Sequence, residues 1–252
     1  DLLLPTPSPP RPTPAVIYIH HGGWRNGDRS YGMYPWHGPL LAANGFVVAN
    51  VSHRFSSQAP FPAQIYDVKA AVRWLRANAT TYGIDPDRIG AWGDSSGGQL
   101  AALLGTTTGR AELEGDCGNP EWSSAVQAVV MRCAPSDFRN ELREPAEVLD
   151  ALFGGPPEQT ARLRELASPL AHVHRGAPPF YIVHGTRDET VPFAQAESLA
   201  AALRAHDVDV TFRIMEGLRH NLQPDLDAPW GSEPWTDLGQ DALAFFTRTL
   251  TG

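Results

Sequence analysis

The stretch that most constrains this chain is "RIGAWGDSSGGQLAALLG", residues 88–105. It opens with an apolar run typical of a buried strand. It continues with small and apolar residues typical of a buried helix. Ser95 lies between the two, and Gly93 and Gly97 remove side chains that would clash at a sharp turn. A helix N-terminus following this serine would direct free N–H groups at developing negative charge. The stretch therefore predicts a nucleophilic serine on a strand-to-helix turn.

The rest of the chain repeats this strand-to-helix rhythm. Short runs rich in β-branched and aromatic residues predict strands at 15–20, 45–53, 88–93, 126–134, 179–185 and 208–215. Amphipathic or apolar segments between them predict helices at 63–83, 96–109, 192–207 and 236–250. This alternation predicts an α/β fold with a mostly parallel central sheet and helices on both faces. We expect one domain over residues 1–252, because this length does not require two.

Two segments depart from the rhythm. A polar, helix-prone excursion at 137–175 is longer than a plain crossover, and is either a lid or substrate wall or a set of surface helices. The opening "DLLLPTPSPP" reads as the end of a strand running into a proline-rich connection. We therefore expect that the natural chain is longer.

The candidate partners of Ser95 lie downstream. Trypsin-like proteases carry a similar "GDSGG" stretch, but they need a histidine and an aspartate before the serine and are antiparallel barrels. The order serine, acid, histidine used by α/β-hydrolases fits better. Asp188 follows the strand at 179–185, and His220 follows the strand at 208–215. Both would reach the sheet edge where Ser95 lies, with His220 as base and Asp188 as the acid that orients it.

Other side chains compete for these roles. Glu189 adjoins Asp188 but should point elsewhere, and His184 is interpreted as a packed, hydrogen-bonded strand histidine. His172 and His174 fall in the excursion as surface candidates, and no further ligand spacing accompanies them. The sequence therefore predicts no metal site and no cofactor.

A glycine pair follows the strand at 15–20, in "HHGGW", residues 20–24. Backbone N–H groups of Gly22 and Gly23, together with that of Ser96, could face a reacting carbonyl and form an oxyanion hole. A flexible turn is the alternative interpretation.

Together these motifs resemble those of α/β-hydrolase carboxylesterases, in particular the hormone-sensitive-lipase-like and the feruloyl/acetyl esterase-like groups. The similar blocks are "HHGGW", "GDSSGG", "HGTRDETVP" and "GLRHNL", and the resemblance extends from about residue 12 to 250. It implies the α/β-hydrolase fold, with Ser95, Asp188 and His220 as catalytic residues. It also implies Gly22, Gly23 and Ser96 as oxyanion donors.

The sequence departs from this pattern at His21, where the resembling enzymes usually carry the first glycine of "HGGGW". His21 would then stand beside the site and narrow it. The N-terminal hairpin that the resemblance implies before the first parallel strand is mostly missing. Trp24, Tyr34, Trp36 and Phe138 are candidates for a substrate pocket, although large aromatics more often pack in cores.

Charge and hydropathy limit the kinds of partner that this chain can bind. A net charge of −8 argues against nucleic acid, and no apolar run is long enough to span a membrane. The expected partner is a small-molecule ester, while the oligomeric state and the compartment, cytoplasmic or secreted, stay open. Cys117 and Cys133 are either free thiols or one disulfide.

The sequence thus favours a serine carboxylesterase acting on short-chain acyl, acetyl or hydroxycinnamoyl esters. The same serine chemistry would serve an amide or formamide hydrolase or a peptidase. A non-catalytic ligand-binding homologue is a third alternative, which the presence of Ser95, Asp188 and His220 disfavours.

Overall fold

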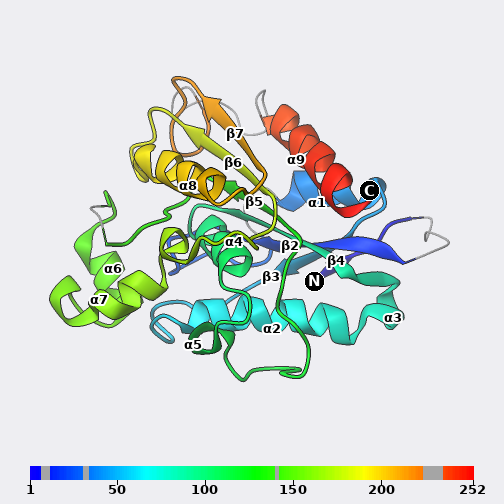
Figure 1. The fold of residues 1–252 in the computed structure, drawn as a ribbon, viewed down its shortest axis with the longest axis horizontal. Coiled ribbons are helices and arrows are strands. Elements are labelled where there is room, and N and C mark those ends of the chain that lie inside the picture. The colour runs from blue at the N-terminus through cyan, green and yellow to red at the C-terminus, as the bar shows by residue number, and fades with distance from the viewer. Residues whose placement is uncertain (7–11, 31–33, 140–141, 224–234) are drawn as a thin grey trace.

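A single mixed sheet organises the chain (Figure 1). The computed structural model describes residues 1–6, 12–30, 34–139, 142–223 and 235–252. Its strands are β1 Leu2–Leu3, β2 Thr13–Ile19, β3 Val47–Val51, β4 Ile84–Asp94, β5 Ala128–Arg132, β6 Phe180–Gly185 and β7 Val210–Met215. Their order is β1-β3-β2-β4-β5-β6-β7, and only β1 runs antiparallel to its neighbour. The predicted parallel α/β architecture is confirmed.

Helices cover both faces of this sheet (Figure 1). On one face lie α2 (Ala63–Ala77), α4 (Ser96–Thr106) and α8 (Ala194–Ala205). On the other lie α1 (Tyr34–Ala43) and α9 (Trp235–Leu250). Right-handed crossovers in a parallel sheet place successive helices in this way, and both sheet faces become buried.

Alternate side chains of the strand β2 pack into two hydrophobic clusters, one on each face of the sheet. Ile17 and Ile19 pack with the α2 and α4 side, whereas Val16 and Tyr18 pack with the α1 and α9 side. Successive side chains of a strand point to opposite faces, so a strand buried on both needs an unbroken apolar run. That run is what the sequence shows at 15–20.

Three helical segments differ from the sequence-based expectation. The helix predicted at 63–83 is split at Asn78 into α2 and α3 (Ala79–Tyr82), and Gly83 in a left-handed conformation ends α3. The helix α1 was not predicted, because Gly38 and Pro39 inside it weaken any helical pattern. The short α5 (Ala111–Glu114) lies in the loop before β5.

The excursion consists of α6 (Ala146–Phe153), α7 (Pro157–Leu166) and the 3₁₀ helix η1 (Pro169–His172). Helices α6 and α7 lie beside the sheet layers (Figure 1), and an Arg164–Asp150 ion pair of 3.1 Å joins them. The side chain of Gln195 on α8 anchors the start of the excursion, accepting hydrogen bonds from the backbone N–H groups of Ser136 and Asp137.

The cysteines form no disulfide, so that alternative is wrong: Cys117 is an exposed thiol and Cys133 a buried one. None of the helices in the described ranges is long and apolar enough to cross a bilayer.

Candidate active site

Ser95 occupies a strained turn between β4 and α4, with φ of 51° and ψ of −120°. Steric crowding requires glycine at both flanking positions. A Cβ on Gly93 would lie 2.1 Å from the Gly97 carbonyl oxygen. One on Gly97 would lie 2.2 Å from the carbonyl oxygen of Ile19 in β2. The backbone N–H of Ser95 donates to the Arg132 carbonyl at 2.8 Å, which ties the turn to β5. The sequence therefore folds into the expected turn with the serine at its apex.

His220 and Asp188 meet Ser95 from the loops after β7 and β6. The His220 Nε2 atom lies 3.0 Å from Ser95 Oγ, and its Nδ1 atom lies 2.8 Å from Asp188 Oδ2. Strands β4, β6 and β7 all end at the same edge of the sheet, which brings together residues separated by 125 and 32 positions in the chain. The three side chains thus form a continuous hydrogen-bonded chain.

The Asp188 carboxylate is fixed from several sides. Its Oδ1 atom accepts hydrogen bonds from the backbone N–H groups of Thr190 and Val191 at 2.9 and 2.8 Å. Its Oδ2 atom lies 3.0 Å from Nε2 of His184, which is fully buried at the end of β6. Because Oδ1 is held by the backbone, Oδ2 remains directed at His220. The packed, hydrogen-bonded role expected for His184 is what the structure has, and its contact with Asp188 was not foreseen.

Electrostatics keep this acid ionised. Burial alone would raise the pKa of Asp188, but hydrogen bonds from His184 and His220 outweigh it and hold the pKa below its usual range. An ionised carboxylate can stabilise a positive charge on His220 while that histidine holds a proton.

The glycine pair after β2 adopts left-handed geometry. Gly22 has φ of 130° and Gly23 has φ of 60°, and a Cβ on Gly22 would lie 2.1 Å from the Asn26 carbonyl oxygen. Ser96 is the first residue of α4, so its N–H belongs to the unpaired group at the helix N-terminus. These features suit backbone donors at the site, and the oxyanion assignment of Gly22, Gly23 and Ser96 remains a prediction.

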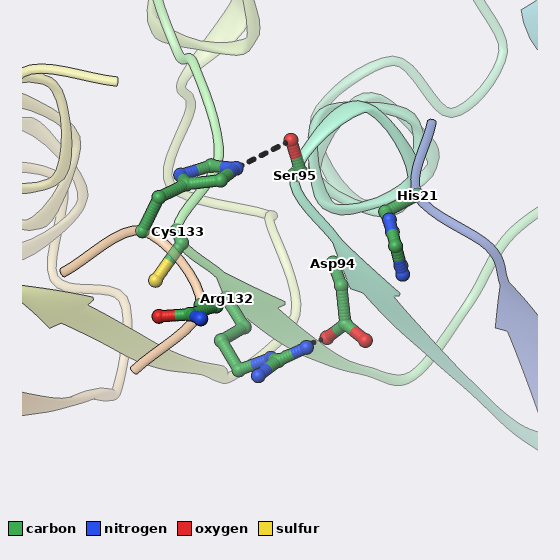
Figure 2. A pocket seen from close by; sticks show the side chains of 7 residues that line it. His21, Asp94, Ser95, Arg132 and Cys133 are labelled. Carbon is green, nitrogen blue, oxygen red and sulfur yellow. Dashed lines mark hydrogen bonds and ion pairs between the residues drawn. The ribbon is translucent and has the colours of Figure 1, made fainter. Parts of the chain in front are cut away.

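A small cavity opens beside Ser95 (Figure 2). Its lining combines the expected Ser95, His220 and His21 with residues that the sequence did not suggest, namely Asp94, Arg132, Cys133 and Asn221. Only strand register brings Asp94 and Arg132 together, since they are Cα partners on β4 and β5. Burial lowers the pKa of His21 to about 4, so this ring is neutral near neutral pH.

The aromatic candidates are placed differently. Trp24 and Phe138 are buried and pack against each other, with ring centroids 5.6 Å apart, and Trp24 donates to Gln99. They belong to the main core cluster and do not line the cavity at Ser95. The side chains of Tyr34 and Trp36 lie outside the described residues.

The competing polar residues have other partners. Glu189 pairs with Arg219 at 3.1 Å and accepts the backbone N–H of His220. His172 is buried against the Leu166 carbonyl, so its expected surface position is wrong, whereas His174 is exposed. Within the described ranges no group of three His, Cys, Asp or Glu side chains is arranged to hold a metal.

The chain is similar in sequence to a known family and to several esterases. Residues 1–203 match the family model BD-FAE. The chain belongs to the BD-FAE family. Esterase LipC from Mycobacterium tuberculosis is 36% identical over 203 residues, which cover 78% of this chain and 50% of LipC. The chain spans about half the length of the curated relatives it matches.

Solved structures of esterases share this fold. A truncated carbohydrate esterase from gut microbiota has a TM-score of 0.85 and 31% identity, covering 100% of this chain and 90% of that one. Esterase Est2 from Thermogutta terrifontis has a TM-score of 0.80 and 25% identity, covering 98% and 85%. The predicted α/β-hydrolase fold and the predicted relationship to carboxylesterases are confirmed.

Proposed function

We propose that this BD-FAE protein is a serine carboxylesterase in which Ser95 is the nucleophile, His220 the general base and Asp188 the orienting acid. The observation that carries the proposal is the hydrogen-bonded chain from Ser95 Oγ through the His220 ring to Asp188 Oδ2, with distances of 3.0 and 2.8 Å. Both distances fall in the range needed for proton transfer. The similarity to esterase LipC, to the gut carbohydrate esterase and to Est2 supports the reaction class.

The reaction proceeds in two steps. Ser95 Oγ forms a bond to the ester carbonyl carbon and passes its proton to His220 Nε2, which gives it to the departing alkoxide as the C–O bond breaks. Water then attacks the acyl-enzyme, His220 takes the water proton, and that proton returns to Ser95 as the acid product leaves. Backbone N–H groups of Gly22, Gly23 and Ser96 stabilise the oxyanion in each step.

Asp188 acts on the histidine rather than on the substrate. By accepting the Nδ1–H of His220 it leaves Nε2 free to accept the serine proton. Its low pKa keeps it charged when His220 becomes an imidazolium.

We propose that the excursion forms a substrate wall near the site. The Arg143 guanidinium donates to the Asp188 carbonyl at 3.1 Å, so the segment before α6 is fastened to the loop that carries the acid. Burial raises the pKa of Glu144, with a smaller opposing effect of His220, which places that carboxyl within electrostatic reach of the site. The substrate is a small-molecule ester with a short acyl, acetyl or hydroxycinnamoyl group.

The test replaces each of the two adjacent serines. Ser95→Ala should lower kcat for p-nitrophenyl acetate by about 10⁴-fold or more with the fold retained, because the nucleophile is lost. Ser96→Ala should cost far less, since its backbone N–H remains, and exposed Ser57→Ala serves as the control. Full activity of Ser95→Ala would sink the proposal. Hydrolysis of p-nitroacetanilide or formyl-amides in preference to esters would favour the amidase alternative instead.

A further inference from the structure

The cavity beside Ser95 is small and includes the reacting groups. Its volume is about 60 Å³, and both Ser95 and His220 contribute to its lining. An apolar cavity that holds one benzene ring measures roughly 150 Å³. The cavity can therefore enclose a few non-hydrogen atoms, and an aromatic ring would have to lie largely outside it.

A buried ion pair closes its inner side (Figure 2). Arg132 Nε lies 2.7 Å from Asp94 Oδ1, and the two side chains are only 8% and 3% exposed. The Tyr18 hydroxyl donates to Asp94 Oδ2 at 2.5 Å. The His21 ring lies on the side of Asp94 away from Arg132 and also lines the cavity, at a position where the resembling enzymes usually have glycine (Figure 2).

This inner wall resists displacement. Asp94 and Arg132 are register partners at the ends of β4 and β5, so their backbones are fixed in the sheet. Separating a buried pair leaves uncompensated charge, a cost far above what one methylene group gains by burial. A longer acyl chain therefore cannot open the cavity by pushing the pair apart.

The order of the two chemical steps decides which part of the ester lies in the cavity. The alcohol must leave while the acyl group is still bonded to Ser95, and the attacking water then takes the place of the alcohol. An alcohol held against the inner wall of the cavity, beneath the acyl-enzyme, would block the attacking water, whereas an alcohol on the solvent side can leave and be replaced by water. The acyl group therefore belongs in the cavity, and the alcohol points toward solvent.

We propose that Asp94, Arg132 and His21 wall an acyl site that accepts acetyl-sized groups and excludes hydroxycinnamoyl and longer aliphatic acyl groups. This inference rests on the proposed esterase function and selects one substrate class within it. The larger cavity of about 300 Å³ near Phe138 is not an alternative acyl site, since neither Ser95 nor His220 lines it.

The first experiment varies the acyl group with the alcohol fixed. We expect kcat/KM to fall from p-nitrophenyl acetate to butyrate by at least about tenfold, given roughly 10–200-fold per misfitted methylene, and the ferulate ester to be hydrolysed at least about 100-fold more slowly than acetate. Comparable rates for acetate, hexanoate and ferulate would overturn the acyl-site proposal. No hydrolysis of any ester would overturn the esterase function, and the inference with it.

The second experiment varies the alcohol with acetyl fixed. Methyl, hexyl and naphthyl acetates should differ in KM by less than about tenfold after correction for the leaving-group pKa. A strict limit on alcohol size combined with tolerance of long acyl groups would place the alcohol in the cavity and overturn the assignment.

The third experiment enlarges the cavity. The double variant Asp94→Asn/Arg132→Met removes the charges, retains an acceptor for Tyr18 and shortens the wall, so the butyrate-to-acetate ratio of kcat/KM should rise at least about tenfold. His21→Gly should raise the same ratio and does not depend on the ion pair. Lys69→Met/Glu114→Gln, at a partly buried ion pair away from the cavity, is the control and should leave the ratio unchanged. Unchanged ratios in both cavity variants would overturn the proposal.

Discussion

At the scale of single residues, the adjacent carboxylates of Asp188 and Glu189 have different hydrogen-bond partners. Asp188 accepts from His220 Nδ1, whereas Glu189 accepts from the His220 backbone N–H and from Arg219. Chain position alone cannot distinguish them, because both follow β6. Backbone hydrogen bonds from Thr190 and Val191 fix Asp188 instead.

This difference predicts unequal costs for the two amide substitutions. Asp188→Asn should lower kcat by about 10⁴-fold, because the amide can favour the wrong tautomer of His220. Glu189→Gln should keep activity within about tenfold, since its contacts are exposed and lie outside the proton path. Esterase assays of both variants, with circular dichroism to check folding, make the comparison. Equal losses would assign the acid role to the loop as a whole and contradict the assignment to Asp188.

At the scale of elements, the excursion depends on one side chain of a neighbouring helix. Gln195 on α8 accepts from the backbone N–H groups of Ser136 and Asp137 at 2.9 and 2.8 Å and donates to the Asp137 carbonyl. Gln195 is 7% exposed, so water cannot readily replace these bonds. The chain leaving β5 toward the proposed substrate wall is thus fixed from α8.

Replacing Gln195 by leucine should destabilise the protein by about 2–6 kcal/mol, since each buried N–H left unpaired costs about 1–3 kcal/mol. Urea unfolding followed by tryptophan fluorescence measures this change in the free energy of unfolding. Gln159→Leu, at an exposed position of α7, is the matched control and should stay within about 0.5 kcal/mol. A Gln195→Leu protein as stable as the parent would show that the excursion holds its place without this anchor.

At the scale of the whole molecule, stability depends on keeping buried histidines neutral. His53 stacks on His20 with ring centroids 4.7 Å apart, just behind the glycine turn. Burial lowers the pKa of His53 to about 4 and also lowers the pKa of His20, while Asp67 and the backbone oppose the shift at His53 only weakly. The unfolded chain titrates these groups near pH 6.5.

The free energy of unfolding should therefore fall as the pH decreases from about 6.5 to 4. Above this window both states carry neutral histidines, and within it the unfolded state binds protons that the folded state does not. His53 alone accounts for up to about 3 kcal/mol, at about 1.4 kcal/mol for each pKa unit. Urea unfolding at several pH values should give a shallower slope for His53→Phe, while exposed His206→Gln should match the parent. Identical slopes for His53→Phe and the parent would contradict this account.

The sequence by itself determined the fold class and the three residues that meet at the site. Strand and helix periods are local properties of the sequence. Gly93 and Gly97 mark a turn that other residues cannot make, so "GDSSGG" alone predicts this turn. The order of Ser95, Asp188 and His220 along the chain then placed all three at one sheet edge. The helix α1 escaped detection because packing, rather than local propensity, maintains it around Gly38 and Pro39.

Only the tertiary structure decided what surrounds Ser95. Asp94 and Arg132 are 38 residues apart, and no local pattern shows that β4 and β5 are aligned so that the two side chains pair. The contact between His184 and Asp188, only four residues apart, depends on how the loop after β6 folds back. The neutral state of the His21 ring follows from its burial. Sequence patterns encode which residues meet at the site, because local geometry fixes the turn that carries Ser95. The size and charge of the cavity arise from strand register and burial, which exist only in the folded chain.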